Sequence, residues 1–209
     1  MKKIVFYGSG NISQALISGL ISAGYKKNLI EFIDRNKINS RKTKKLGATK
    51  TNLKTINTKS IIFLGVKPKD AMNAYAEICA EVKKPKIVSL VAGIKSNKYL
   101  SESNDVELIR AMPNTSSQFN KGITAICNCN ANKTTFNQVS SIFKKVGTTI
   151  DIAKENKIDD FTGLIGSGPA YFFYLLKVYE KRILKLCDGD KSKKDTIICN
   201  LLEGVSYSI

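Results

Sequence analysis

The sequence predicts an α/β protein in which an N-terminal Rossmann-type, doubly wound sheet is followed by an incomplete all-helical domain. Strand-like and helix-like segments alternate across residues 1–153, as in a parallel sheet covered on both faces. The predicted strands are continuous apolar runs, as expected of strands buried on both sides. Beyond residue 153 the pattern is helical only. We therefore expect two domains, residues 1–153 and residues 154–209.

The composition excludes several classes of catalyst. The chain has 209 residues, with 34 Lys and Arg, 17 Asp and Glu, and no His. Ser-His and Cys-His catalytic pairs and histidine metal sites are therefore ruled out, as is the usual general acid or base near neutral pH. The net charge of +17 comes from lysines scattered along the whole chain, without a basic stripe interleaved with aromatics. We therefore expect no nucleic-acid partner.

Cysteines and apolar runs indicate the compartment. The five cysteines are odd in number and show no CxxC pair, which favours reduced thiols over a disulfide framework or a zinc site. Met1-Lys2-Lys3 leads straight into a strand-like run without a signal peptide. No apolar stretch approaches the roughly 20 residues of a membrane span. We expect a soluble, cytoplasmic protein with no bound metal and no membrane partner.

The chain opens with a strand, a glycine turn and a helix. Residues 3–7 form a short apolar run, and apolar residues then recur at helical spacing from residue 12 until Gly24 ends the helix. A second strand is predicted at 29–33 and closes at Asp34. Further helices are predicted at 35–45, 70–80 and 134–146, and further strands at 60–66, 86–91, 106–111 and 148–152, with an edge strand at 123–126.

The C-terminal part predicts helices that need a partner. Pro169 suits the first turn of a helix, and residues 171–179 are apolar on nearly all sides. Ile197, Leu201 and Val205 recur at helical spacing in the last segment. The chain offers no further element to cover these helices, so we expect homo-oligomerisation through them, or a truncated domain.

The turn after the first strand has the pattern of a dinucleotide-binding loop. Gly8-Ser9-Gly10-Asn11-Ile12-Ser13 fits G-x-G-x-x-[small], directly after a strand and at the start of a helix. The first glycine permits the tight turn, the second lets a pyrophosphate approach the backbone, and the third small residue allows close packing of helix on strand. Amides of the helix N-terminus then hold the phosphates. Ser13 stands where Gly or Ala is usual.

The end of the second strand bears on the choice of cofactor. Asp34 lies 21 residues beyond Ser13, where an acid normally binds the adenosine ribose and suits NAD. Arg35 follows immediately, with Lys37 and Arg41 close by, and such cations suit the 2′-phosphate of NADP. The residues alone leave both cofactors open.

Three more segments end strands at the same edge of the predicted sheet. They are Val66-Lys67-Pro68, Val91-Ala92-Gly93 and the run from Arg110 to Thr115. In an open α/β sheet, ligands lie outside the carboxyl ends of the strands. We therefore expect these segments to line one rim of a single site.

The order of these motifs resembles one enzyme family. GSGNIS, LGVKPKD, VSLVAG, RAMPNT and TGLIGSGPAYFF follow one another between about residues 2 and 180. In this order and spacing they resemble pyrroline-5-carboxylate reductase, the last enzyme of proline synthesis. The resemblance implies a Rossmann domain joined to a helical dimerisation domain. It further implies reduction of a cyclic imine, 1-pyrroline-5-carboxylate, by NADPH, or NADH in some members, in a dimer or higher oligomer.

The resemblance also implies site residues. The pyrophosphate would be held by Tyr7, Gly8, Ser9, Gly10, Asn11 and Ile12. The adenosine ribose would face Asp34, Arg35 and Asn36, and Asn52 matches a position that contacts the cofactor. Gly65, Val66, Lys67, Pro68, Ala92, Gly93 and Asn114 would lie along the cofactor toward the nicotinamide. The substrate would be bordered by Met112, Pro113, Asn114, Thr115 and Glu155. Residues 166–170 would pack the helical domain against the active site.

The sequence departs from the family at its C-terminus. Family members continue further and carry an S-P-G-G-T-T loop that holds the substrate carboxylate, whereas this sequence contains no Gly-Gly pair. The departure leaves open a functional reductase or a truncated, inactive remnant that binds NAD(P). Another imine or β-hydroxyacid reductase on the same fold, and a pure binding or structural role, are further alternatives.

The expected chemistry is hydride transfer from C4 of the reduced nicotinamide to C5 of the pyrroline C=N. An imine accepts hydride well only when it is protonated, and water can supply that proton, so a missing histidine is tolerable. Lys67 is a conceivable nearby cation, although a structural Lys-Pro corner is the favoured explanation for it. No catalytic residue is assigned.

Overall fold

The computed structural model describes residues 1–208. It divides into two compact units, Met1–Gly166 and Ser167–Ile209. The predicted division lies earlier, at residue 153, because no motif reports how far the segment after it packs on the sheet. Each unit is described by itself below.

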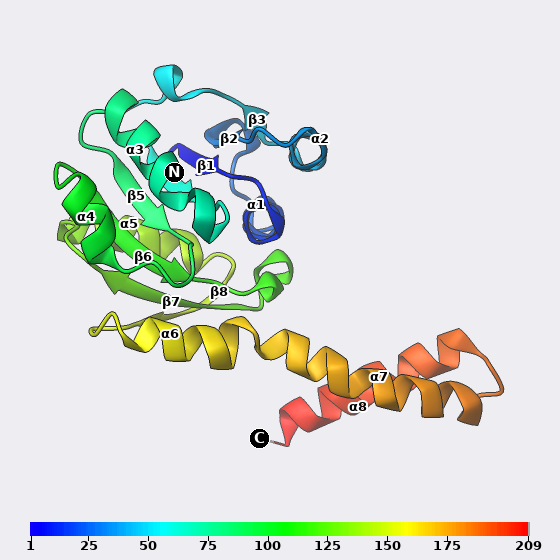
Figure 1. Cartoon of the computed structure of the whole chain (residues 1–209). Coiled ribbons are helices and arrows are strands. Elements are labelled where there is room, and N and C mark those ends of the chain that lie inside the picture. The colour runs from blue at the N-terminus through cyan, green and yellow to red at the C-terminus, as the bar shows by residue number, and fades with distance from the viewer. Residues whose placement is uncertain (209) are drawn as a thin grey trace. The chain divides into compact units, whose positions relative to one another are not determined.

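The first unit is built on one eight-stranded sheet in the order β3-β2-β1-β4-β5-β6-β7-β8 (Figure 1). Its strands are β1 (Ile4–Tyr7), β2 (Ile30–Ile33), β3 (Thr49–Lys50), β4 (Ile61–Leu64), β5 (Lys86–Ser89), β6 (Glu107–Met112), β7 (Gly122–Asn128) and β8 (Gly147–Asp151). All neighbouring pairs are parallel except β6 and β7. The prediction of a Rossmann-type, doubly wound sheet is confirmed.

The prediction of an edge strand at 123–126 is wrong. β7 pairs with β6 on one side and β8 on the other, and the edges of the sheet are β3 and β8. The chain reverses through the 3-10 segment Thr115–Phe119 and returns antiparallel to β6. A continuous apolar run does not report strand direction, so the sequence could not show this reversal. The two-residue β3 was not predicted either.

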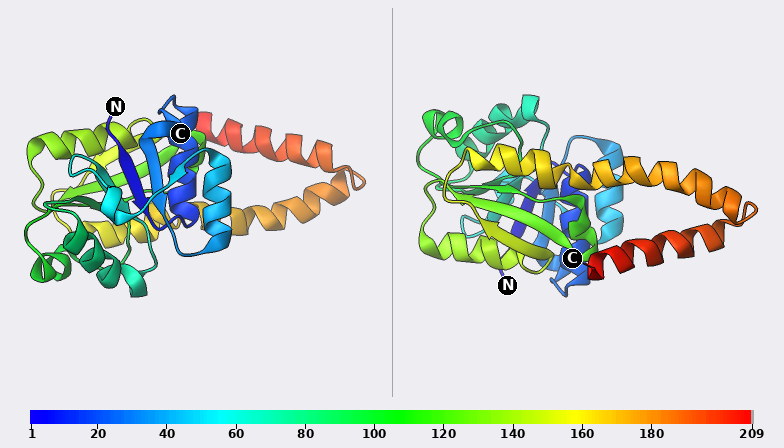
Figure 2. Two further views of the ribbon diagram at one scale, coloured as in Figure 1. Left: turned by 90° about the horizontal axis from the view of Figure 1, so that it is seen from above. Right: turned by 90° about the horizontal axis from the view of Figure 1, so that it is seen from below.

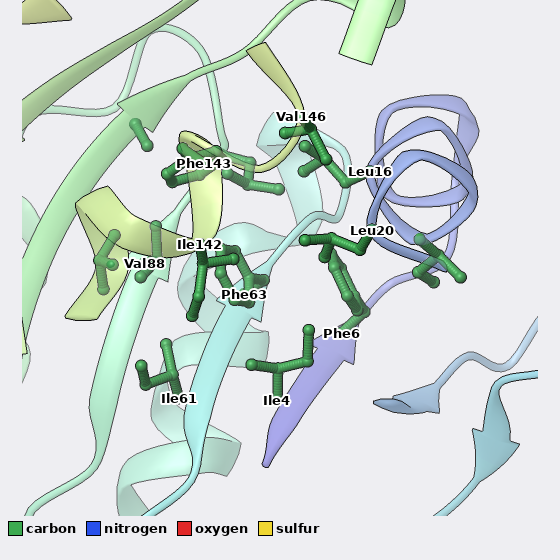
Figure 3. Packing of buried hydrophobic residues seen from close by; sticks show 14 of the residues in the cluster. Ile4, Phe6, Leu16, Leu20, Ile61, Phe63, Val88, Ile142, Phe143 and Val146 are labelled. Atoms are coloured by element: carbon green, nitrogen blue, oxygen red, sulfur yellow. The ribbon is translucent and has the colours of Figure 1, made fainter. Parts of the chain in front are cut away.

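Helices cover both faces of the sheet. They are α1 (Asn11–Ser22), α2 (Lys37–Leu46), α3 (Ala71–Glu81), α4 (Ser96–Glu102), α5 (Lys133–Phe143) and α6 (Lys157–Phe161). One face packs on α1 and α5, where Phe6 and Phe63 stack with ring centroids 5.0 Å apart beneath Phe143 (Figure 3). The other face packs on α3 and α4 through Tyr75 and Tyr99. Successive residues of β1 point to alternate faces, as strand geometry requires.

Helix α6 closes the first unit against the β6–β7 part of the second face. Ile158 is fully buried and Phe161 is 9% exposed, and both pack with Met112, Ala125 and Cys127. This cluster explains why the unit extends to Gly166. A π-helical turn at Thr162–Gly166 follows α6.

The second unit is a hairpin of two long helices, α7 (Gly168–Leu186) and α8 (Lys191–Tyr207) (Figure 2). Asp188 and Gly189 have positive φ in the turn between them. The Asp190 side chain caps α8 by accepting from the amides of Ser192 and Lys193. Pro169 lies in the first turn of α7, as the sequence predicts.

Apolar side chains of α7 and α8 are exposed in the single chain. Phe173 is 67% exposed and Ile197 is 40% exposed. These two residues lie in the apolar patch that the sequence predicts for a lone copy of the chain, and that prediction is confirmed. Among the described residues, no helix is both long enough and apolar enough to cross a membrane.

Candidate functional site

The candidate site lies beside β1, at the point in the sheet where the strand order reverses. β2 and β3 extend the sheet on one side of β1, and β4 and the later strands extend it on the other. Open α/β sheets bind ligands at this switch point, outside the carboxyl ends of the strands. Tyr7 at the end of β1 is in register with Ile33 and Leu64. The three loops that follow these residues therefore meet at one level.

A cavity of about 300 Å³ opens at this point. The ends of β1, β2 and β4 and the loops after them contribute Tyr7, Gly8, Ile33, Asp34, Arg35, Asn36 and Val66. Helix α3 and the residue before it contribute Asp70, Asn73, Ala74 and Glu77. Six of the predicted cofactor residues are thereby brought together: Tyr7, Gly8, Asp34, Arg35, Asn36 and Val66. A second hollow beside it shares Tyr7 and Arg35 and contains Asn52.

The two glycines of the loop have different reasons to be glycine. Gly8 has φ +90°, and a Cβ there would lie 2.7 Å from the carbonyl oxygen of Gly65, so the fold itself requires glycine. Gly10 has φ −70°, and a Cβ there would meet no atom within 4 Å. The fold therefore does not need glycine at position 10. A free approach to the backbone remains as the reason for it, and a pyrophosphate needs such an approach.

Gly10 also begins α1 as its N-cap, with no side chain capping the helix. The amides of the first turn, which include those of Asn11 and Ile12, have no acceptor within an α-helix. Unsatisfied amides and the positive end of the helix dipole form an anion site. The residues in this loop thus fit a dinucleotide pyrophosphate.

Ser13 is the departure from the usual Gly or Ala, and the structure accommodates it. The side chain is fully buried, and its hydroxyl donates to the carbonyl oxygen of Gly8 at 2.7 Å. A Cβ on Gly65 would collide with this hydroxyl. The hydroxyl thus fills the gap between helix and strands and ties α1 to the loop.

Asp34 organises the loop from the end of β2. Its Oδ2 accepts from the amide and the hydroxyl of Ser9, each at 2.7 Å, and its Oδ1 accepts from the amide of Asn36 at 2.7 Å. Desolvation raises the pKa of Asp34, but the hydrogen bonds from Ser9 and Asn36 outweigh it and leave the pKa below its usual value. The carboxylate is therefore ionised and already bonded within the protein.

Arg35 and Tyr7 meet on one acid, Glu77 of α3. Arg35 Nη2 lies 2.5 Å from Glu77 Oε1, and the Tyr7 hydroxyl donates to Glu77 Oε2. Desolvation and the neighbouring Glu77 raise the pKa of Tyr7 to about 12. The hydrogen bond from Tyr7 and the pairing with Arg35 lower the pKa of Glu77. Glu77 therefore stays charged.

The rim segments lie after the later strands. Lys67 precedes the 3-10 segment Pro68–Asp70, with Pro68 in its first turn. After β5, Ala92 is partly buried against Met112 and Ile158, and Gly93 turns the chain with φ +74°. Pro68 and the positive-φ Gly93 each turn the chain after a strand, so neither β4 nor β5 continues beyond this edge of the sheet.

The segment after β6 is held by burial and by a side-chain hydrogen bond to β7. Asn114 is 6% exposed, and its Oδ1 accepts from the amide of Ile123 at 3.1 Å. Met112 is 7% exposed in the cluster with Ile158 and Phe161. Pro113 follows Met112, and Thr115 begins the 3-10 segment. The segment is thus positioned rigidly at the rim, with Thr115 exposed.

Glu155 is bound into the structure rather than left free. Its two carboxylate oxygens accept from the amide and hydroxyl of Ser96, each at 2.6 Å, and Oε1 accepts from Arg110 at 2.8 Å. Arg110 is 1% exposed, and its other nitrogen lies 3.8 Å from Asp159. Desolvation raises the pKa of Glu155, but Ser96 and Arg110 outweigh it and lower the pKa.

Some residues of the cavity were missed from sequence. Glu77, Asn73 and Ala74 line it and belong to no motif, and Asp70 lines it as the last residue of the LGVKPKD motif without having been predicted as a site residue. In a sequence, an acidic residue on a helix predicts a solvent-exposed face and not a binding site. Glu77 is also 70 residues from Tyr7 in the chain. A signal existed only for Asp70, which follows the rim segment Val66-Lys67-Pro68.

Comparisons with known proteins agree with the motifs. Residues 3–93 match the family described as NADP oxidoreductase coenzyme F420-dependent. The chain is 32% identical to pyrroline-5-carboxylate reductase 1 of Bacillus subtilis, over 86% of this chain and 63% of that protein. It is 28% identical to the pyrroline-5-carboxylate reductase of Staphylococcus epidermidis, over 99% of this chain and 79% of the relative.

Solved structures show the same fold. Pyrroline carboxylate reductase of Plasmodium falciparum with NADP bound aligns with a TM-score of 0.85 at 23% identity, over 98% of this chain and 78% of that one. Pyrroline-5-carboxylate reductase of Coxiella burnetii aligns with a TM-score of 0.80 at 25% identity, over 98% and 80%. This chain spans less than two thirds of the Bacillus subtilis relative.

The strand order and the glycine loop define a Rossmann-type fold with a dinucleotide-binding loop pattern. Among proteins with this fold, the chain is a relative of the pyrroline-5-carboxylate reductases.

Proposed function

We propose that this chain takes part in the reduction of 1-pyrroline-5-carboxylate to L-proline, the last step of proline synthesis, with NADPH or NADH as reductant. One observation on this chain carries the proposal. Gly10 heads an uncapped helix at the switch point and has open space where a side chain would lie. The names of the relatives support the substrate, and the NADP bound to the Plasmodium falciparum enzyme supports the cofactor.

The cofactor is proposed to lie along the carboxyl edge of the sheet. Tyr7 and the loop from Gly8 to Ile12 would hold the pyrophosphate, and Asp34, Arg35, Asn36 and Asn52 would surround the adenosine. The rim residues would lead toward the nicotinamide: Gly65, Val66, Lys67, Pro68, Ala92, Gly93 and Asn114. Hydrogen bonds from Ser9 to Asp34 fix the loop before a ligand arrives. Such preorganisation reduces the entropy lost on binding.

The reduced cofactor would supply a hydride to C5 of the cyclic imine. The chain's contribution is to bind, orient and shield. Met112, Pro113, Asn114 and Thr115 are proposed to border the substrate, and burial of Met112 and Asn114 keeps that segment fixed. Glu155 would act by holding Arg110 and the α4 N-terminus beneath this rim. Protonation of the imine from solvent needs no histidine.

The exposed apolar side chains of α7 point to a partner of the same kind. They comprise Tyr171, Phe172, Phe173, Tyr174, Leu175, Val178 and Tyr179. A contiguous exposed apolar surface of this kind marks an interface. We propose a homo-oligomer formed through the C-terminal helices, in a reducing cytoplasm where the cysteines stay as free thiols.

The oligomer proposal predicts that Phe173→Lys lowers self-association. The wild-type chain is expected to sediment as a dimer or larger, and the variant to shift toward the monomer at the same concentration. Phe119→Lys is the matched control, because Phe119 is an equally exposed aromatic, at 71%, on the other compact unit. A wild-type chain that stays monomeric and soluble at high concentration in sedimentation velocity would contradict the proposal.

Turnover tests the proposed reaction. The folded chain is mixed with reduced cofactor, and the loss of nicotinamide absorbance is followed on adding 1-pyrroline-5-carboxylate. Substrate-dependent oxidation supports the reductase. Cofactor binding without oxidation, in protein shown to be folded, would instead make the chain a non-catalytic NAD(P)-binding protein.

A further inference from the structure

The proposed site contains an acid that no sequence motif marks. Glu77 of α3 lines both hollows at the end of β1 and bonds to Tyr7 and Arg35. NADPH and NADH differ only by a phosphate on the 2′-oxygen of the adenosine ribose. The residues around that oxygen therefore decide between the two cofactors.

The charge around the cavity that contains Asp34 is unfavourable for a 2′-phosphate. Three carboxylates line it, those of Asp34, Asp70 and Glu77. Among the lining residues in the described part of the chain, Arg35 is the only cation. Asp34 uses its oxygens on Ser9 and Asn36 and stays ionised. Lys54 lines only the second hollow, so a 2′-phosphate in this cavity depends on Arg35 for its main attraction.

Arg35 is not free for that role. Its guanidinium already lies 2.5 Å from Glu77, and its side chain is 84% exposed while that of Glu77 is 42% exposed. An exposed ion pair of this kind is weak, so its competition lowers the affinity for a phosphate only a few-fold. The Tyr7 hydroxyl holds the carboxylate from the other side and fixes Glu77 in place. The phosphate must therefore displace Glu77 or approach it as a like charge.

We propose that Glu77 is a specificity-determining residue: it competes with the 2′-phosphate of NADPH for Arg35, so that the chain discriminates little between NADPH and NADH. The inference rests on the proposed dinucleotide site. It assigns a role to an α3 residue outside the glycine loop and the β2 end.

Binding of the two cofactors to three single variants tests this assignment. Kd values for NADPH and NADH are measured by nicotinamide fluorescence with the full chain. Glu77→Gln keeps the size of the side chain and removes its charge, and it is expected to tighten NADPH about fivefold. NADH binding is expected to change less than twofold. Arg35→Gln is expected to weaken NADPH about tenfold and to leave NADH nearly unchanged.

Glu81→Gln is the matched control. Glu81 lies one turn further along α3, lines the second hollow but not the cavity that contains Asp34, is exposed, and makes no ion pair within the described residues. Its loss of charge is expected to change the ratio of the two Kd values less than twofold. In the double variant with Arg35→Gln, the effect of Glu77→Gln on NADPH should fall below twofold, because the contested cation is gone.

The outcomes distinguish a failure of the proposed dinucleotide site from a failure of the role assigned to Glu77. If the wild-type chain binds neither dinucleotide, the proposed site and this inference both fall. If it binds both, and Glu77→Gln leaves the ratio as in the wild type or Glu81→Gln shifts it equally, only the role of Glu77 falls. A wild-type preference for NADPH above about a hundredfold would also overturn it.

Discussion

Replacing Gly10 with aspartate is expected to abolish dinucleotide binding while the protein stays folded. The new side chain meets no atom of the protein, because a Cβ at position 10 has nothing within 4 Å. Aspartate is also a favoured N-cap, so α1 is expected to keep its stability or to gain roughly a few tenths of a kcal/mol. The carboxylate would lie where the pyrophosphate binds. Repulsion of roughly 4 kcal/mol at 4 Å corresponds to an affinity loss on the order of a thousandfold.

The measurement is titration with NADPH and NADH, beside thermal unfolding of the same samples. Asn132→Asp is the matched control, since Asn132 is the N-cap of α5 and its side chain accepts from the amide of Thr135. This variant adds the same charge at another helix N-terminus and is expected to bind normally. Unchanged cofactor affinity in Gly10→Asp would remove the pyrophosphate from this loop.

Replacing Glu155 with glutamine is expected to destabilise the protein by about 2–3 kcal/mol. The change leaves Arg110 charged and 1% exposed, with only Asp159 nearby at 3.8 Å. Removing one partner of a fully buried pair costs roughly 3–5 kcal/mol. A lower value is expected here, because the Glu155 side chain is 25% exposed.

Urea unfolding measures this loss, with Asp105→Asn as control. Asp105 pairs with Lys84 at 3.6 Å in an exposed bridge, and its loss is expected to cost under about 0.5 kcal/mol. Equal losses in the two variants would show that the Arg110 network adds no stability.

The same network predicts a dependence on pH. The folded-state pKa of Glu155 is lowered, so its contribution to the free energy of unfolding is complete above the ordinary pKa of 4.5. The contribution is lost as the pH falls through the lower, folded-state pKa. The wild-type chain should therefore lose stability on acidification more steeply than Glu155→Gln. Parallel stability curves for the two proteins below pH 4.5 would contradict this.

Local pattern predicted the first βαβ segment well. The apolar run of β1, the glycine turn and the helical period of α1 each depend on residues close in sequence. Gly47 ends α2 with φ +104°, a left-handed conformation that favours glycine at the end of a helix. The short helix α4 escaped prediction because Ser96–Glu102 has little apolar period, and it is fixed by Tyr99 packing on the sheet.

The site was predictable only where a motif carries it. The switch-point residues at Tyr7, Gly8 and Asp34 follow strand ends, so the sheet rule brings them together. The pairing of Arg35 with Glu77 joins residues 42 positions apart, and no periodicity reports it. The burial of Arg110 is equally invisible in the sequence. Its position at the end of a strand suggests a rim residue, whereas packing of α6 buries it against Glu155.

Transfer of a labelled hydride tests the central claim most directly. The chain is incubated with 1-pyrroline-5-carboxylate and reduced cofactor in which both hydrogens at C4 of the nicotinamide are deuterium, and the product is examined by mass spectrometry. The expected product is L-proline with one deuterium at C5, formed in proportion to the cofactor oxidised. The Gly10→Asp variant is expected to form no L-proline. Proline without the label, or no proline from folded protein that binds the cofactor, would contradict the central claim.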